Sequence, residues 1–167
     1  MEFKNIKHTF APVFDERSEK LILGTFPSVR SRETQFYYGH PQNRFWKVMA
    51  QITGSSLPVT VEEKKAMLLA NHIAIWDVIG RCTITGSSDS SIRDVEVNDI
   101  GALLCHSNIS AVYGNGAKAC ELYDRYVREK TGMDIVKLPS TSPANAAWSL
   151  ERLCEAYGQA LQMEKRV

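Results

Sequence analysis

The sequence predicts an α/β fold, a three-layer α/β/α sandwich on a four-stranded parallel sheet. Two observations lead to this prediction. Short apolar runs, typical of strands that are buried on both faces, alternate along the chain with longer segments of helical period. Strands that alternate with helices form right-handed βαβ units, and these units build a largely parallel sheet. The chain has 167 residues, 44% of them hydrophobic, so residues 1–167 can form a single domain with a substantial core.

The first part of the chain leads to a loop on which the prediction of function depends. Residues 1–18 carry several aromatic side chains and are expected to form an arm on the edge of the domain. The apolar run Glu19–Leu23 predicts the first strand, which Gly24 and Pro27 end. Residues 29–40 show no period and contain aromatic residues, so we expect a long functional loop there.

Helices and strands alternate through the rest of the chain. Asn43 begins a predicted helix over 44–53, which Gly54 closes. Thr60 and Glu63 have the spacing of a capping box and predict a helix that ends near Asn71. The remaining predicted elements are a strand over 72–79, a loop over 83–91, a short helix from 98 to 105, a strand over 109–113, a turn at 114–116, a helix over 117–130, a strand over 134–138 and a final helix over 142–166.

Charge, cysteine and histidine content narrow the kinds of protein and site. The net charge is +1, from 20 basic and 19 acidic residues, so any contact with DNA must depend on a local basic patch. The four cysteines contain no Cys-x-x-Cys pair, which favours free thiols over a disulfide framework, a zinc site or an iron–sulfur cluster. The four histidines contain no i, i+4 pair, so we expect no metal. Because no run approaches the length of a membrane span, we expect a soluble, cytoplasmic protein, and we expect it to be monomeric.

Two loops are expected to form the walls of a cleft at one edge of the sheet. Gly24–Ser28 follows the first predicted strand and Pro139–Pro143 follows the fourth, and both are rich in proline and hydroxyl residues. The chain lacks the phosphate-binding loop of nucleotide triphosphatases, the glycine motif of dinucleotide enzymes and the Gly-x-Ser-x-Gly elbow of common hydrolases, and we expect no cofactor. Aromatic rings, an amide at Asn43 and a carboxylate at Asp77 remain, a set suited to holding a flat heterocycle.

Several stretches of sequence carry a resemblance to a known family. Gly-Thr-Phe-Pro-Ser at 24–28 is followed by Phe-Tyr-Tyr-Gly-His-Pro-Gln-Asn-Arg-Phe-Trp-Lys-Val-Met at 36–49. Ile-Trp-Asp-Val stands at 75–78, Gly-Ser-Ser-Asp-Ser-Ser-Ile at 86–92 and Asn-Asp-Ile at 98–100. This pattern, over about residues 8–160, resembles the uracil-DNA glycosylase superfamily and most closely its DNA-deoxyinosine (hypoxanthine-DNA) glycosylase branch. The resemblance implies an enzyme that flips a deaminated base out of DNA and hydrolyses its N-glycosidic bond. It also implies an α/β/α sandwich on a four-stranded parallel sheet.

The resemblance assigns roles to individual residues. Phe26 stands where the superfamily usually carries the Asp or Asn that positions water, and the hypoxanthine branch implies that Asn43 takes this catalytic role. The residues expected to bind the base are Gly24, Thr25, Phe26, Tyr38 and Asp77. Tyr38 would stack on the base and Asp77 would read its edge. The residues expected to contact DNA are Ser28, Arg30, Arg44, Ser140, Thr141, Ser142, Ala144 and Asn145.

Other interpretations remain open at the level of sequence. Asn43 could serve only as a helix cap, Asp77 could cap a turn, and Tyr38 could be a loop aromatic packed on the core. Ala144 is a small residue where the superfamily often carries a bulky wedge. Alternative functions are removal of uracil or xanthine, a catalytically inactive module that binds DNA or a nucleobase, and hydrolysis of free nucleosides. Neither loop contains lysine, so a Schiff-base lyase is not expected.

Overall fold

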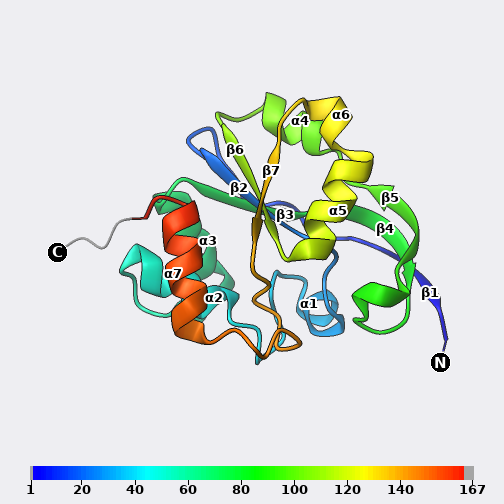
Figure 1. Cartoon of the computed structure of the whole chain (residues 1–167), viewed down its shortest axis with the longest axis horizontal. Coiled ribbons are helices and arrows are strands. Elements are labelled where there is room, and N and C mark those ends of the chain that lie inside the picture. The colour runs from blue at the N-terminus through cyan, green and yellow to red at the C-terminus, as the bar shows by residue number, and fades with distance from the viewer. Residues whose placement is uncertain (1, 164–167) are drawn as a thin grey trace.

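Four parallel strands form the central sheet of the computed structural model, which describes residues 2–163. Their order across the sheet is β3 (Ile73–Asp77), β2 (Lys20–Gly24), β6 (Ala111–Asn115) and β7 (Ile135–Leu138). Gly24 pairs with Asp77, and Asn115 pairs with Leu138, so the strand ends lie at the same edge. The predicted fold class and parallel sheet are confirmed, and Figure 1 shows the strands at the centre of the molecule.

Helices cover both faces of this sheet because successive strand residues point to opposite sides. Ile22 packs in one core cluster and its neighbours Leu21 and Leu23 pack in the other, all of them fully buried. The first face is covered by α2 (Phe45–Thr53), α3 (Val61–Ala70) and α7 (Leu150–Ala160). The second face is covered by α4 (Ile100–Cys105), α5 (Ala117–Tyr126) and the residues leading into α6 (Arg128–Thr131).

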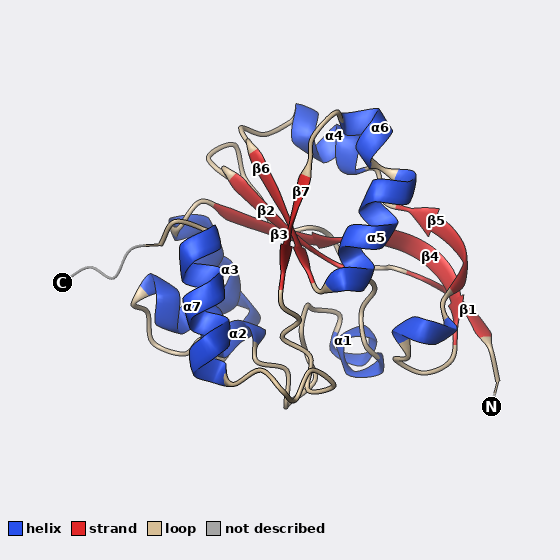
Figure 2. Cartoon of the chain, in the orientation of Figure 1, coloured by secondary structure: helices blue, strands red, loops and turns tan. Residues whose placement is uncertain are grey.

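A second, antiparallel sheet is the largest departure from the prediction. It has the order β1 (Lys4–Lys7), β4 (Ile79–Ile84) and β5 (Arg93–Val97), and Figure 2 shows it extending away from the parallel strands. The expected strand over 72–79 is divided between the two sheets, because β3 of the parallel sheet ends at Asp77 and β4 of the antiparallel sheet begins at Ile79. Gly80 does not end a strand, because it lies within β4, where a Cβ would come within 2.8 Å of the Asn98 Oδ1 atom.

Three other boundaries differ from the prediction. The expected long loop over 29–40 contains a short helix, α1 (Val29–Thr34), whose first turn is capped by the Ser28 hydroxyl. The predicted helix over 117–130 is interrupted at Val127. The final helix begins at Leu150 rather than at 142, because Ser149 caps it and the preceding residues form turns. Residues 164–166 of that prediction lie outside the described residues.

Several local predictions are confirmed. Thr60 and Glu63 form the capping box of α3, and this helix ends at Asn71. Gly54 closes α2 with a positive φ of 68°. The Asn43 side chain accepts a hydrogen bond from the Phe45 amide at the start of α2, although Arg44 is the capping residue. Local capping signals in the sequence therefore placed both ends of α3 and the end of α2 correctly, whereas α2 begins one residue later than predicted.

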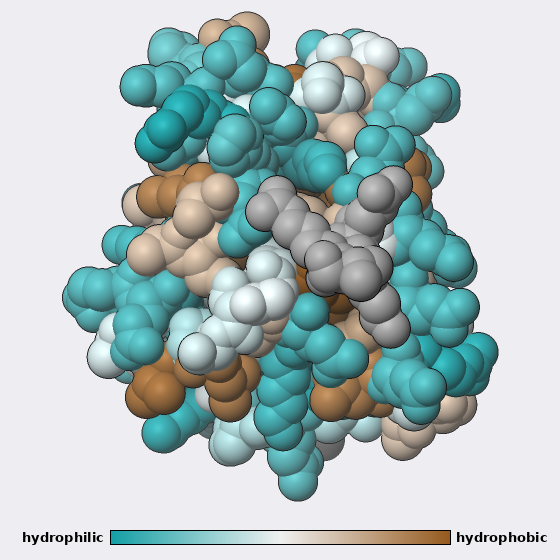
Figure 3. Space-filling view, turned by 90° about the vertical axis from the view of Figure 1, so that its left-hand side faces the viewer, coloured by the Kyte–Doolittle hydropathy of each residue, from teal (hydrophilic) through white to brown (hydrophobic). Residues whose placement is uncertain are grey.

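Figure 3 shows the face formed by α2, α3 and α7, and the residues that are coloured there by hydropathy are mainly hydrophilic. Apolar side chains occur there in small, separate groups. Within residues 2–163, no helix is both long enough and apolar enough to cross a membrane.

Candidate active site

A pocket of about 290 Å³ opens at the carboxyl ends of the parallel strands. Gly24, Asp77 and Asn115 end three of these strands and line the pocket, and the loop after β7 supplies a further wall. The volume lies near the lower limit of about 300 Å³ for small-molecule sites, so the pocket suits a single flat ring system. Loops at the carboxyl ends of strands therefore form the site, as the sequence predicted.

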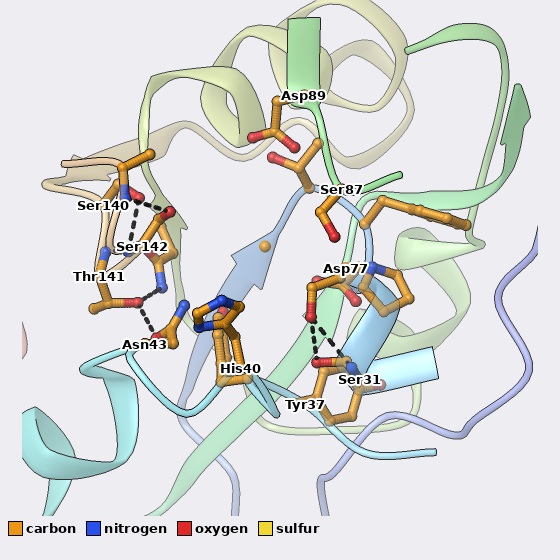
Figure 4. Close-up of a pocket in the computed structure, with 18 of the residues that line it drawn as sticks. Ser31, Tyr37, His40, Asn43, Asp77, Ser87, Asp89, Ser140, Thr141 and Ser142 are labelled. Atoms are coloured by element: carbon orange, nitrogen blue, oxygen red, sulfur yellow. Dashed lines mark hydrogen bonds between the residues drawn. The ribbon is translucent and has the colours of Figure 1, made fainter. Parts of the chain in front are cut away.

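Most of the residues that the sequence assigned to the site are brought together here. Figure 4 shows Asn43 with Ser140, Thr141 and Ser142 on one side, and Asp77 with Tyr37 on the other. The predicted residues that line the pocket are Gly24, Thr25, Phe26, Ser28, Tyr38, Asn43, Asp77, Ser140, Thr141, Ser142 and Ala144. The predicted residues that do not line it are Arg30, Arg44 and Asn145.

Asn43 is held by two hydrogen bonds to its side-chain oxygen. The Phe45 amide donates at 2.9 Å and the Thr141 hydroxyl donates at 2.8 Å. Because a backbone N–H can only donate, the accepting atom of Asn43 must be Oδ1, which fixes the orientation of the amide. The Asn43 Nδ2 group makes no hydrogen bond within residues 2–163, so it is the donor that this side chain can offer to a ligand.

Asn115 extends this network to the end of β6. Its Nδ2 donates to the Thr141 hydroxyl at 3.0 Å, and its Oδ1 accepts from the Thr141 amide at 3.0 Å. Thr141 is completely buried, so these bonds are shielded from water. Sequence reasoning placed Asn115 in a turn and missed it as a site residue, although an amide at the end of a buried strand was a usable signal.

Asp77 is buried on the opposite wall, with 4% of its surface exposed. One carboxylate oxygen, Oδ2, lies 2.9 Å from Nε2 of His8, a residue of the N-terminal arm. The other oxygen, Oδ1, lies against Gly24, where a Cβ would come within 2.4 Å of it. Only glycine leaves room for the carboxylate at this position. His8 was not assigned to the site from the sequence, because 69 positions separate it from Asp77.

Tyr38 lies between the two walls. Its ring stacks on Phe45 at 4.0 Å, and its φ of 54° is in the left-handed region. Its hydroxyl is buried without a hydrogen-bond partner within the described residues. Burial, with a further effect from the charge of Asp77, raises the pKa of the Tyr38 hydroxyl well above its usual value, so the group stays neutral.

Phe26 is half-buried at the pocket and is held by its surroundings. The Arg32 guanidinium lies 5.7 Å from the centre of its ring and donates to the carbonyls of Pro27 and Gly86. Burial lowers the pKa of Arg32. These contacts join the 24–28 loop to residues 85–91, which bring Ser87 and Asp89 to the pocket. Neither was predicted as a site residue, although both lie in a loop rich in glycine, serine and aspartate.

The three predicted residues outside the pocket have other contacts. Arg44 donates to the carbonyls of Ser142 and Asn145 at 3.1 Å each, and also to the carbonyl of Trp148. The Asn145 amide donates to the Ser140 carbonyl at 3.0 Å. Both side chains thus fasten the loop after β7. Arg30 is exposed and pairs with Glu33 at 3.4 Å.

Within residues 2–163, no group of three or more His, Cys, Asp or Glu side chains is placed to hold a metal ion. The four cysteines are free thiols, and three of them are buried. Burial raises the pKa of the Cys82 thiol to about 11, which keeps it protonated at neutral pH.

Comparison with known proteins agrees with this geometry. The family model described as the uracil DNA glycosylase superfamily matches residues 11–162. A hypoxanthine DNA glycosylase of Methanosarcina acetivorans is 40% identical over 152 residues, which cover 90% of this chain and 95% of that protein. A hypoxanthine DNA glycosylase of Methanosarcina barkeri is 36% identical over 83% of this chain and 88% of that protein.

A solved structure gives the same result for the fold. The solution NMR structure of a candidate uracil DNA glycosylase from Methanosarcina acetivorans superposes with a TM-score of 0.77 at 36% sequence identity. The match covers 92% of this chain and 96% of that chain. The sequence, the fold and the pocket at the carboxyl ends of the strands together establish that this chain belongs to the uracil DNA glycosylase superfamily.

Proposed function

We propose that this protein is a monofunctional DNA glycosylase of base excision repair that removes hypoxanthine from deoxyinosine in DNA. The observation that carries the proposal is the placement of Asn43 and Asp77 on opposite walls of one base-sized pocket. Relatives named hypoxanthine DNA glycosylase, at 36–40% identity over most of the chain, support the choice of base. Hydrolysis would leave an abasic site in the DNA strand.

Asn43 would position the attacking water. Cleavage of an N-glycosidic bond passes through an oxocarbenium-like state, which requires little base strength but a water held on the correct face of the sugar. Both lone pairs of Asn43 Oδ1 are engaged by Phe45 and Thr141, so Nδ2 is the group that would contact the water. The role of Asn43 is therefore to place the water and not to deprotonate it.

Asp77 would recognise the edge of the base. An ionised carboxylate accepts hydrogen bonds, and hypoxanthine presents an N1–H donor. Adenine, from which hypoxanthine arises by deamination, has a lone pair at N1 and would face the carboxylate with no proton between them. Asp77 would thus separate the damaged base from the normal one.

The hydroxyl-rich loops would contact the DNA backbone. Ser28, Ser140 and Ser142 line the pocket, and hydroxyl groups commonly bind phosphate oxygens. Ala144 is small and exposed, so it would be a weak wedge in the gap left by a flipped base. We therefore expect activity on mispaired or single-stranded sites, which open at low cost. We also expect the protein to act as a monomer in the cytoplasm.

The proposal is tested with labelled oligonucleotides that carry one deoxyinosine, deoxyuridine or deoxyxanthosine. After incubation and alkali treatment, strands with deoxyinosine should break, and strands left without alkali should stay intact because no lyase is present. Asn43→Ala should lose about 100-fold or more of the single-turnover rate, which is typical for loss of a group that acts in the transition state. Release of uracil in preference to hypoxanthine would contradict the proposed substrate.

A second candidate function is a binding module without catalysis. It is favoured by Phe26, which stands where the superfamily usually carries the residue that positions water. An electrophoretic mobility-shift assay on the same oligonucleotides separates the two functions. Preferential binding of deoxyinosine DNA without base release would support the binding module and reject the glycosylase.

A further inference from the structure

The buried contact between His8 and Asp77 joins the N-terminal arm to the pocket. The side chains are 1% and 6% exposed, and Nε2 of His8 lies 2.9 Å from Oδ2 of Asp77. Because a carboxylate oxygen accepts, the Nε2 atom carries the proton and donates it. Within residues 2–163, this is the one side-chain hydrogen bond that Asp77 makes.

The backbone on both sides of this contact is fixed. The His8 amide donates to the Gly80 carbonyl at 2.7 Å, just beyond the β1 and β4 pairing. The Asn98 side chain donates to the carbonyl of Asp77 at 2.9 Å. The His8 ring is also surrounded by the aromatic rings of Phe10, Phe26 and Tyr37, at 4.4 to 6.3 Å between ring centres. The imidazole can therefore move little, and it holds the carboxylate in turn.

The two carboxylate oxygens of Asp77 have different surroundings. Oδ2 is used by His8, whereas Oδ1 faces the glycine at the pocket floor, where Gly24 leaves it uncovered. If His8 were absent, the carboxylate could rotate away from this orientation. A carboxylate turned away from N1 would neither accept the N1–H of hypoxanthine nor repel the N1 lone pair of adenine, so the distinction between the two bases would weaken.

We propose that His8 is a specificity-determining residue, which holds the Asp77 carboxylate so that Oδ1 accepts the N1–H of hypoxanthine and rejects adenine. This inference rests on the proposed function, in which Asp77 reads the base. His8 touches neither base nor sugar in this scheme, so it is a positioning residue that acts through Asp77.

The test compares two substitutions of His8. His8→Phe keeps a ring of similar size and removes the donor, whereas His8→Gln places an amide N–H close to the position of Nε2. We expect His8→Phe to lower the single-turnover rate for hypoxanthine about tenfold or more, the loss expected when a buried hydrogen bond to a charged group is removed. We expect His8→Gln to restore most of the rate.

Selectivity for hypoxanthine over adenine is the measurement that a purely structural role of His8 would leave unchanged. The ratio of hypoxanthine to adenine, measured both as base release and as binding in a mobility-shift assay, should fall in His8→Phe and recover in His8→Gln. Thr9→Val is the matched control, because it removes the hydrogen bond from the neighbouring arm residue to Gln35 and lies on the surface. It should keep the selectivity of the parent.

The double variant His8→Phe/Asp77→Asn shows whether His8 acts through Asp77. If His8 acts through Asp77, the double variant should be no less selective than Asp77→Asn alone. Additive losses of selectivity in the double variant would overturn the role of His8. Unchanged selectivity in His8→Phe, together with a loss of selectivity in Asp77→Asn, would also overturn it. In both cases the proposed function would stand. Unchanged selectivity in Asp77→Asn would reject base reading by Asp77 and the role of His8 together. A parent that neither releases nor preferentially binds hypoxanthine would overturn both proposals.

Discussion

The two walls of the pocket are built in different ways. The wall that carries Asn43 is a network, in which Thr141 and Asn115 connect α2, the loop after β7 and the end of β6 by four hydrogen bonds. In the wall that carries Asp77, the carboxylate is held by one side-chain hydrogen bond within the described residues, from His8 in the arm. Several hydrogen bonds hold the Asn43 amide, so the loss of one of them should leave its orientation largely unchanged, whereas the orientation of the Asp77 carboxylate should be sensitive to one residue that is distant in the sequence.

The largest effect on this comparison is expected from Gly24→Ala, because the new methyl group would press on the Asp77 wall and on Tyr38, which lies between the walls. Its Cβ would lie 2.4 Å from Asp77 Oδ1 and 3.2 Å from the Tyr38 hydroxyl. Asp77 cannot withdraw easily, since His8 holds it. Displacement of reacting groups by about 1 Å can cost about 100-fold in rate, and we expect a loss of this size in single-turnover base release.

Gly101→Ala is the control for Gly24→Ala. It lies inside α4, and the nearest atom to its Cβ would be at an ordinary contact distance of 3.6 Å. Its activity should match the parent. Full activity of Gly24→Ala would show that the Asp77 side chain can move away from the methyl group without loss of function.

Thr141→Val should have the next largest effect, because it breaks the network at its centre. The substitution keeps the shape but removes the donor to Asn43 and leaves the Asn115 amide without its acceptor. An unsatisfied buried group costs about 1–3 kcal/mol of folding free energy, measurable by thermal or denaturant unfolding. We expect the single-turnover rate to fall while the dissociation constant for DNA changes less.

Thr85→Val is the matched control for this substitution. The Thr85 hydroxyl is buried without a hydrogen-bond partner within the described residues, so its removal should cost no stability. Equal stability losses in the two variants would mean that the hydrogen bonds of Thr141 contribute nothing particular to the Asn43 wall.

The smallest effect is expected from Tyr38→Phe, which sharpens the comparison at the boundary of the two walls. The Tyr38 hydroxyl is buried and has no hydrogen-bond partner within residues 2–163, so removing it should leave the free energy of unfolding unchanged or raise it by about 1 kcal/mol. The ring that is predicted to stack on the base is kept, and hypoxanthine release should stay close to that of the parent. A large loss of activity would assign the hydroxyl a direct role that ring stacking does not explain.

Local patterns in the sequence were enough to predict the parallel sheet. The strands around Ile22 and Ile75 are buried on both faces, and such strands appear as continuous apolar runs. The antiparallel strands β4 and β5 are harder to recognise, because exposed charged residues such as Arg81 and Glu96 alternate with apolar ones and β4 contains a glycine. Their pairing with β1 depends on contacts that are distant in the sequence.

The residues of the candidate site also differ in whether local sequence patterns could predict them. Gly24 and Asp77 could be predicted because they end buried strands, and the family resemblance pointed to Asn43. His8 could not be found in this way, since a histidine in a polar arm carries no local signal of a partner 69 positions away. Arg44 was predicted to contact DNA, but its guanidinium is engaged by backbone carbonyls of the loop after β7, a role that spacing alone does not reveal.

The short β1 strand has a consequence for how this protein can be altered. Its pairing with β4 ends at Lys7 and Arg81, one position before His8. Because side chains of a strand alternate between faces, a shift of β1 by one residue would turn His8 away from Asp77. Deletion of the first eight residues would spare every strand of the parallel sheet and still remove the contact that is proposed to orient Asp77. Such a truncated protein would be expected to fold and to release bases from DNA with a relaxed choice of base, and each base released in error would leave an abasic site.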